Sequence, residues 1–430
     1  MNYKDRLLKA IPGGAHTYSR GYDQYPENAP QILERADGAY TYDIDGNKYL
    51  DYGMALRAVN LGYANKDVNQ AAIKQIENGN NLTRASVIEL EAAELLIDMI
   101  DSVDMVKFTK NGSTATTAAI KLSKVHTSRQ MVLRCEEHPF FSYDDWFIGS
   151  TPMNKGVPQK DRDNTKLFNY NDINSLKVLF EKYPDKVACV ILEPAATEHP
   201  KDNFLQKVKS LCEDFGAVFI LDEMITGFRW DMKGAQHYYG VEADLCTFGK
   251  AMANGFSVAA VCGKREIMQL GSTEKIGQER MFLLSTTHGA EMSGLGAFVE
   301  TMKFMESNNV VNHLWKYGEL LITLMNETAK KFGLEKNFVA NGIACSPYYL
   351  TFDKGGDSCL GLRTLFAQEM VKNGVLMPWI ALSYAHGDKE LELTKKALES
   401  SFKVYKKAVK EGFEKYLVGD AIKPVFRKYN

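Results

Sequence analysis

The chain has 430 residues, of which 45% are hydrophobic and 25% are charged, and its formal net charge is −2. This composition is typical of a soluble globular protein, and the length favours two lobes with separate cores. With no basic cluster there is no reason to expect nucleic acid as a partner, and no apolar run approaches the roughly 20 residues of a membrane span.

The cysteines and the N-terminal residues indicate the cellular compartment in which the protein is expected. The seven cysteines form an odd set without CxxC spacing, which is typical of buried reduced thiols and not of a disulfide or zinc framework. The first residues, "MNYKDRLLKAIPGG", lack the apolar core of a signal peptide. We therefore expect a cytoplasmic enzyme without a structural metal.

The first 50 residues look irregular and then strand-like. The segment "ILERADGAYTYDIDGNKYLDY" predicts two or three short strands that turn at Asp37-Gly38 and Asp45-Gly46.

From about residue 66, helical and strand patterns alternate. Helical periodicity marks 66–79, 88–100 and 114–128. Short apolar runs that suit strands covered on both faces lie at 105–110, 131–135, 186–194, 217–223, 245–250 and 258–263. This alternation predicts an α/β fold with a mostly parallel sheet.

The pattern of predicted secondary structure changes after about residue 295. A long helical pattern covers 294–333, and short strands near 338–352 and two closing helices are expected after it. We therefore predict a large domain at 61–300 and a smaller α+β domain at 301–430, completed by the N-terminal segment 1–60.

Three strands of the predicted sheet end on residues capable of chemistry. Segment 108–120 is a strand, a turn and then a helix whose first amides and Ser113 hydroxyl can hold a phosphate. Asp222 ends a second strand and Lys250 follows a third. Since ligands gather at the carboxyl ends of strands in open α/β sheets, these groups are expected to lie close together.

Each feature alone has an ordinary explanation: a helix cap, an aspartate that caps the next helix, a solvated surface lysine. Together, a phosphate cradle, a carboxylate and a lysine are what pyridoxal phosphate requires of a protein. Lys250 would bind the cofactor as a desolvated amine, and Asp222 would keep the ring nitrogen protonated. Glu223, next to Asp222, is expected to make structural hydrogen bonds.

At this point the sequence resembles a known family, the class III (fold type I) pyridoxal-phosphate-dependent aminotransferases. The resemblance is strongest to their glutamate-1-semialdehyde aminomutase-like branch. It covers nearly the whole chain and rests above all on "LDEMITGFR" (221–229) and "DLCTFGKAMANGFSVAAVCG" (244–263), with "IPGG", "ERADGAYTYDIDGNKYLDY" and "LGYAN" nearer the N-terminus. It implies a large domain with a mostly parallel seven-stranded sheet flanked by helices, plus a smaller α+β domain.

The resemblance also implies roles for individual residues. Lys250 falls on the Schiff-base lysine and Asp222 on the partner of the pyridine nitrogen. Gly112 and Ser113 fall on the phosphate loop, and Thr287 falls on a phosphate-binding threonine that the family supplies from the neighbouring subunit. Met224 corresponds to the residue under the cofactor ring, and Phe140 to the residue on the ring face. A homodimer with shared active sites is therefore expected.

The sequence departs from the family around the cofactor. Thr114 replaces a glutamate of the phosphate loop, and Phe140-Phe141-Ser142 replaces a Tyr-His-Gly stretch. The stretch "STTHGAE" also differs from that of true aminomutases. Phe140 can still stack on a ring, so these changes favour a different substrate or reaction balance over a loss of cofactor binding.

Three functions remain open. The first is a transaminase that moves an amino group from an amino-acid donor, expected to be glutamate, to a carbonyl acceptor, for example a sugar or sugar acid of a surface-polysaccharide pathway. The second is an intramolecular 2,1-aminomutase acting on a semialdehyde. The third is a catalytically silent α/β binding protein. A substrate carboxylate is expected to bind Arg20, which the resemblance aligns with a carboxylate-binding arginine, with Arg57 as second candidate.

Overall fold

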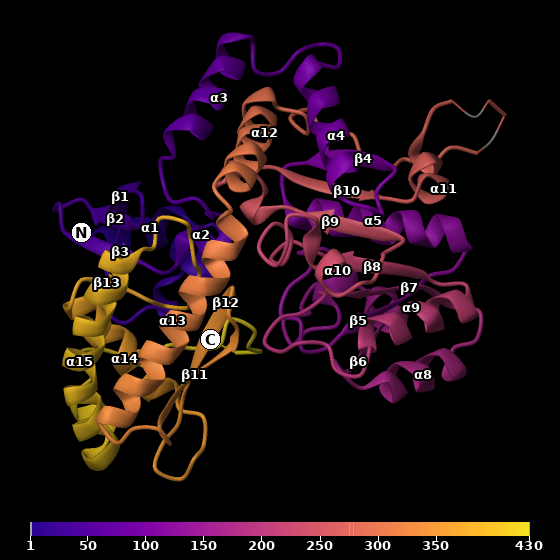
Figure 1. Cartoon of the computed structure of the whole chain (residues 1–430). Coiled ribbons are helices and arrows are strands. Elements are labelled where there is room, and N and C mark those ends of the chain that lie inside the picture. The colour runs from indigo at the N-terminus through magenta and orange to yellow at the C-terminus, as the bar shows by residue number, and fades with distance from the viewer. Residues whose placement is uncertain (1, 275, 278, 430) are drawn as a thin grey trace. The chain divides into compact units, whose positions relative to one another are not determined.

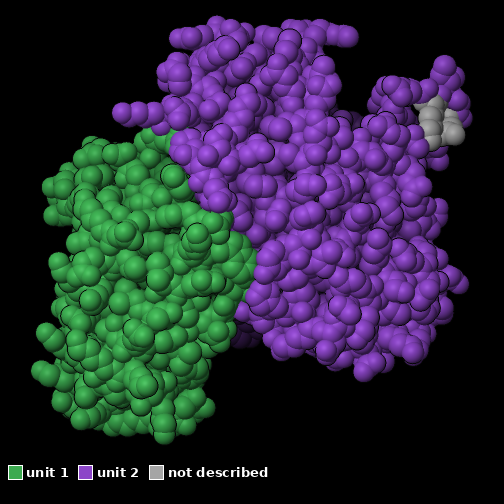
Figure 2. Space-filling view, in the orientation of Figure 1, with its two compact units in different colours: residues 1–65, 312–427 green, residues 66–311, 428–430 purple. Residues whose placement is uncertain are grey.

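The computed structural model describes residues 2–274, 276–277 and 279–429. They form two compact units, each of which is described by itself. Unit 1 comprises residues 1–65 and 312–427, and unit 2 comprises residues 66–311 and 428–430 (Figure 2). The sequence pattern predicted domain limits near 60 and 300, and the units change at 65 and 311.

Unit 2 is built on a seven-stranded sheet with the order β4-β10-β9-β8-β7-β5-β6 (Figure 1). Its strands are β4 (Met105–Thr109), β5 (Met131–Cys135), β6 (Thr165–Phe168), β7 (Val187–Leu192), β8 (Val218–Asp222), β9 (Leu245–Phe248) and β10 (Ala259–Gly263). Only β10 runs antiparallel to its neighbours β4 and β9, so the sheet is mostly parallel, as predicted.

The apolar runs of the sequence become strands covered on both faces. Every residue of β5, β7, β8, β9 and β10 is buried. This burial is typical of a parallel sheet between helices.

Helices flank this sheet. The longer ones in unit 2 are α3 (Lys66–Glu77), α4 (Val87–Met99), α5 (Gly112–Thr127), α8 (Ile173–Lys182), α9 (Phe204–Phe215) and α12 (Met292–Ser307). The shorter ones are α6 (Asp145–Ile148), α7 (Gln159–Asn164), α10 (Gly234–Tyr238) and α11 (Arg265–Met268). Helix α5 packs across one face, on β4, β7, β8, β9 and β10, while α12 packs on α3, α4 and the turn that follows β9.

The strand directions bring the predicted strand ends together. Strands β8 and β9 are parallel, and β4 has the same direction as β9 because both are antiparallel to β10. The carboxyl ends of β4, β8 and β9 therefore lie at one edge of the sheet. This edge carries the loop before α5, Asp222 and Lys250.

Unit 1 contains a four-stranded sheet with the order β1-β2-β3-β13 and a hairpin, β11-β12. Its strands are β1 (Leu33–Asp37), β2 (Tyr40–Asp43), β3 (Lys48–Asp51), β11 (Phe338–Ile343), β12 (Ser346–Thr351) and β13 (Val375–Leu376). The helices are α1 (Tyr3–Ala10), α2 (Met54–Arg57), α14 (Leu360–Lys372), α15 (Asp388–Glu411) and most of α13 (Val310–Lys331). The three N-terminal strands, the hairpin and the two closing helices are as predicted.

Two segments differ from the expectation. The irregular N-terminal stretch contains α1, and the Asn2 side chain caps this helix by accepting a 2.9 Å hydrogen bond from the Asp5 amide. Helix α1 buries no residue, so no buried apolar face predicted it from the sequence. The helical pattern of 294–333 is interrupted after Ser307, because Asn309 adopts a left-handed φ of 52° between α12 and α13.

The remaining sequence expectations concern cysteines and membrane spans. All seven cysteines are free thiols, and all but Cys359 are buried. Within the described ranges, no helix combines the length and apolar character that crossing a membrane would need.

Candidate active site

Asp222 is a buried carboxylate at the end of β8. It is 2% exposed, and its Oδ1 accepts hydrogen bonds from the Met224 amide at 3.0 Å and the Thr247 hydroxyl at 2.9 Å. Among the described residues, Oδ2 accepts none. Burial raises the pKa of Asp222 to about 6, against the lowering effect of the Lys250 charge and the two hydrogen bonds. Oδ2 therefore remains available to a ligand.

Glu223 is also buried, and its carboxylate makes structural contacts with described residues that follow it in the chain. Its carboxylate accepts hydrogen bonds from the Thr226 hydroxyl at 2.6 Å and from the amides of Ala235 and Gln236 at 2.8 and 2.9 Å. These amides belong to the first turn of α10, so the side chain stabilises that helix end. The structural hydrogen bonds expected for Glu223 are present.

Lys250 opens the turn that follows β9. Its φ of 43° is left-handed, a conformation that costs a non-glycine residue about 1–2 kcal/mol and that clusters at functional sites. Its side chain is half-buried, and its charge lowers the pKa of Asp222. The predicted lysine and aspartate therefore lie close enough for their charges to interact.

The loop between β4 and α5 presents donors at the same edge. Asn111 caps α5 by accepting hydrogen bonds from the amide and hydroxyl of Thr114 at 2.9 and 3.0 Å. The amides of Gly112 and Ser113 donate to no acceptor within the described part of the chain. The Ser113 hydroxyl accepts from the Tyr143 amide at 3.2 Å. Two free amides at the start of a 16-residue helix favour an anion.

Met224 links the loop to the lysine turn. A Cβ built on Gly112 would lie 2.9 Å from the Met224 sulfur, and one built on Gly249 would lie 2.6 Å from it. Larger residues at either glycine would displace this thioether. The absence of a side chain at Gly112 and at Gly249 therefore leaves room for the Met224 side chain between the two loops.

The segment after β5, where the sequence departs from the family, is aromatic. Phe140 is 49% exposed and packs edge-on against Phe147, with ring centroids 5.6 Å apart. Phe141 is buried, and its carbonyl accepts a 2.8 Å bond from the Thr116 hydroxyl of α5. Phe140 therefore keeps a face available for contact, while Phe141 anchors the segment to α5.

Thr287 lies on an exposed segment before α12. Its carbonyl accepts a 3.1 Å hydrogen bond from Asn81, and its hydroxyl has no partner among the described residues. The Thr287 hydroxyl is therefore accessible, as far as the described residues are concerned.

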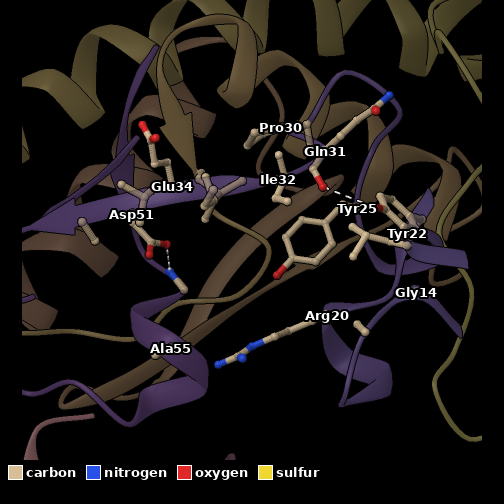
Figure 3. A pocket seen from close by; sticks show the side chains of 18 of the residues that line it. Gly14, Arg20, Tyr22, Tyr25, Pro30, Gln31, Ile32, Glu34, Asp51 and Ala55 are labelled. Carbon is tan, nitrogen blue, oxygen red and sulfur yellow. Dashed lines mark hydrogen bonds between the residues drawn. The ribbon is translucent and has the colours of Figure 1, made fainter. Parts of the chain in front are cut away.

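Arg20 and Arg57 belong to unit 1. Arg20 lines a cavity of about 610 Å³, into which its guanidinium points near Ala55 (Figure 3). Arg57 ends α2, where all four residues have left-handed φ values, from 38° at Met54 to 69° at Arg57. It is not among the described residues that line the Arg20 cavity.

Sequence reasoning missed two residues that organise the site. Thr247 lies opposite Asp222 in the β8–β9 register; its hydroxyl binds Asp222 and its carbonyl accepts the Glu223 amide at 2.9 Å. Asn111 caps α5. For Asn111, its place three residues before Thr114 is a usable cap signal. For Thr247, only the strand pairing reveals the contact.

The comparisons with known proteins address the family. The family model described as "Aminotransferase class-III" matches residues 22–346. The chain belongs to the class III aminotransferase family.

Individual known proteins resemble the chain over nearly their whole length. A protein of Francisella tularensis subsp. tularensis (strain WY96-3418), named glutamate-1-semialdehyde 2,1-aminomutase, is 30% identical over 410 residues, which are 89% of this chain and 94% of that protein. The FumI protein of Sphingopyxis sp. MTA144, solved in its PLP internal aldimine form, superposes with a TM-score of 0.87 at 25% identity, covering 95% and 97% of the two chains. An omega-transaminase from Sphaerobacter thermophilus gives 0.83 at 23% identity, covering 94% and 97%.

Membership of the class III aminotransferases makes the protein an enzyme of the pyridoxal-phosphate-dependent fold type I class and sets aside the silent binding protein. The residues at the sheet edge fit pyridoxal 5′-phosphate. The free Asp222 Oδ2 suits a protonated ring nitrogen, and the amides of Gly112 and Ser113 suit a phosphate.

Proposed function

We propose that the protein is a transaminase that moves an amino group from an amino acid, glutamate being the expected donor, to a carbonyl acceptor. The observation that carries the proposal is the pairing of the buried Asp222, with one free carboxylate oxygen, and the Lys250 charge beside it. When bound, pyridoxal phosphate supplies an electron sink for the carbon that loses its proton.

Each residue has a distinct role in this proposal. Lys250 binds the cofactor covalently and, when released, is the base that moves the proton at the reacting carbon. Asp222 holds the ring nitrogen in its charged form through Oδ2. The amides of Gly112 and Ser113 hold the phosphate, while Met224 and Phe140 contact the ring.

The second candidate is an aminomutase, which moves an amine within one molecule. The curated relative's name and the match of Arg20 favour it, whereas Thr114, the stretch 140–142 and "STTHGAE" favour transamination. The sugar or sugar-acid acceptor rests on resemblance alone and does not enter the proposal.

A half-reaction experiment separates the two. Purified holoenzyme is mixed with single amino acids, and the absorbance band of the bound cofactor is followed. A transaminase loses the band, releases one equivalent of keto acid and regains the band when a carbonyl acceptor is added. If no donor releases keto acid but a semialdehyde is isomerised, the protein is a mutase.

Arg20 is proposed to bind the donor carboxylate through its planar fork. Arg20→Lys keeps the charge but loses the fork, so the affinity for the amino-acid donor should fall by about 1.5–3 kcal/mol, with cofactor affinity unchanged. Donor titration of the half-reaction measures this. The matched control is Arg35→Lys, because Arg35 lines the same cavity but stacks 3.6 Å above the Tyr42 ring centroid. Equal donor affinity for wild type and Arg20→Lys would remove Arg20 and direct attention to Arg57.

The active unit is proposed to be a homodimer in which Thr287 of one chain contacts the phosphate held by Gly112 and Ser113 of the other. Support comes from the family resemblance and from the exposed Thr287, whose hydroxyl has no partner in the part of the chain that the structure describes. Thr287→Val should weaken cofactor affinity about tenfold, measured by titration at limiting pyridoxal phosphate.

Mixing two variants tests the shared site. In a heterodimer of Lys250→Ala and Thr287→Val chains, one site has the intact lysine of one chain and the intact threonine of the other. At limiting pyridoxal phosphate, mixing should therefore give tighter cofactor binding and higher activity than either homodimer has. No gain on mixing, despite exchange of subunits verified by sedimentation of tagged chains, would mean that Thr287 acts within its own chain.

A further inference from the structure

The Arg20 cavity is an open pocket of unit 1. All the described residues that line it belong to this unit, and they come from the N-terminal segment, β1, the end of β3, the left-handed turn of α2 and the segment that carries Leu376 and Trp379 (Figure 3). At about 610 Å³ it is large enough for a small organic ligand.

The positive charge of Arg20 has no protein partner in this cavity. Among the described residues, its guanidinium makes no hydrogen bond or ion pair. The buried carboxylate of Asp51 is already occupied, since it accepts from the Gly53 amide at 2.6 Å and from the Tyr63 hydroxyl at 2.7 Å.

The other acids of the cavity do not neutralise Arg20 either. Glu27 pairs with Lys4 at 3.1 Å, and the Glu34 carboxylate points away from Arg20 in Figure 3. Arg20 is an exposed residue, so its guanidinium, which has no counter-ion among the described residues, is accessible to an anionic ligand.

Tyr25 presents a second donor to the same space. Figure 3 shows its hydroxyl directed between Asp51 and Arg20, and its ring packs edge-on against Trp379 with centroids 6.2 Å apart. Burial and the Asp51 charge raise the pKa of Tyr25, and the Arg20 charge opposes them, so the hydroxyl stays protonated at working pH. In the described part of the chain this hydroxyl has no hydrogen-bond partner.

A fixed, protonated phenol beside a guanidinium is complementary to a carboxylate. The fork of Arg20 can bind both oxygens, and the Tyr25 hydroxyl can donate to one of them without changing charge. Tyr63 cannot serve in this way, because its hydroxyl donates to Asp51 and accepts from the Ala55 amide at 2.9 Å.

We propose that Tyr25 and Arg20 form one carboxylate site, in which the Tyr25 hydroxyl is a specificity-determining donor for amino donors that carry a carboxylate. This inference rests on the proposed function, since it names a second residue for the substrate group assigned there to Arg20. It predicts selection against amines that lack a carboxylate, because both donors would then be left without an acceptor.

The test uses full-length, cofactor-loaded protein and glutarate, a dicarboxylate without an amine, whose binding is measured by isothermal titration calorimetry. Tyr25→Phe should weaken glutarate binding about tenfold or more, and should raise the KM for glutamate by a similar factor with kcat nearly unchanged. Tyr22→Phe is the matched control: Tyr22 lines the same cavity, but its hydroxyl donates to the Gln31 carbonyl at 3.3 Å. This control should bind glutarate like wild type.

A double-mutant cycle shows whether the two donors share one ligand. The effects of Tyr25→Phe and Arg20→Lys on glutarate binding should not add, because both groups contact the same carboxylate. Near-ultraviolet circular dichroism verifies that each variant is folded.

Two outcomes would overturn the proposal: wild type that does not bind glutarate, or Tyr25→Phe that binds it like wild type. A loss of glutarate binding in Tyr25→Phe, in a protein that transfers no amino group, would instead support the site and contradict the proposed function.

Discussion

Lys250→Ala is expected to lower the turnover number by several orders of magnitude while the protein retains its fold. The lysine supplies both the covalent attachment and the amine that moves a proton at the reacting carbon, and alanine can do neither. Its half-buried side chain lies in a turn outside the sheet, so its loss should cost little stability. Borohydride reduction followed by intact-mass measurement should show the cofactor fixed to wild type and absent from the variant.

The matched control for this prediction is Lys264→Ala. Lys264 also follows a strand of the same sheet, but β10 is antiparallel, so Lys264 lies at the opposite edge, where its Nζ is 2.5 Å from Asp244. A partly exposed ion pair of this kind contributes about 0–1 kcal/mol, and turnover should be unaffected. Substantial turnover by Lys250→Ala, or equal losses in the two variants, would contradict the role given to Lys250.

The central part of the site could be predicted because parallel sheets constrain it strongly. Short apolar runs predicted the strands, and strands of equal direction end at one edge. Asp222 and Lys250 therefore had to approach each other once β8 and β9 were neighbours, although they lie 28 positions apart in the sequence.

The left-handed turn of α2 could not be predicted in this way. Methionine, alanine, leucine and arginine all favour right-handed helix, yet Met54–Arg57 has φ values of 38°, 47°, 63° and 69°. The strain is offset by tertiary contacts, in which Asp51 accepts the Gly53 amide and Tyr63 accepts the Ala55 amide. Local propensity contains no information on these partners.

Tyr25 shows the same limit for function. It has no motif of its own, and its proposed role follows only from a hydroxyl that faces Arg20 across a cavity and has no hydrogen-bond partner among the described residues (Figure 3). Arg20 itself emerged only from resemblance, because an isolated arginine in a loop is usually solvated.

Asp222→Asn is expected to reduce turnover about 10²–10³-fold, because an amide cannot hold the ring nitrogen in its charged form. The same change should stabilise the cofactor-free protein at pH 8. Burial raises the pKa of Asp222 from 3.8 to about 6, so ionised Asp222 is disfavoured in the folded state. Shifts of this size correspond to roughly 3 kcal/mol at most, and the unmatched amide of asparagine reduces the gain to about 1–3 kcal/mol.

The sign of this effect sets its pH dependence. Between pH 3.8 and about 6 the folded protein binds more protons at Asp222 than the unfolded chain does, so wild-type stability falls as pH rises through this window. The advantage of Asp222→Asn should therefore be full above pH 6 and vanish as pH approaches 4. Urea unfolding of both cofactor-free proteins at pH 5 and pH 8 measures this difference. A variant less stable than wild type at pH 8 would mean that Asp222 is a structural residue.

Glu223→Gln is the control that separates the two carboxylates, and its expected effects are the reverse. The glutamine amide nitrogen would replace an oxygen that accepts from Thr226, Ala235 or Gln236, so at least one buried donor would face another donor. We expect a loss of about 2–4 kcal/mol in the free energy of unfolding, with turnover per folded, cofactor-loaded enzyme largely retained. Turnover corrected for the folded fraction, together with urea unfolding, distinguishes the two effects. If Glu223→Gln lowers corrected turnover as much as Asp222→Asn does, the roles of Asp222 and Glu223 are wrongly assigned.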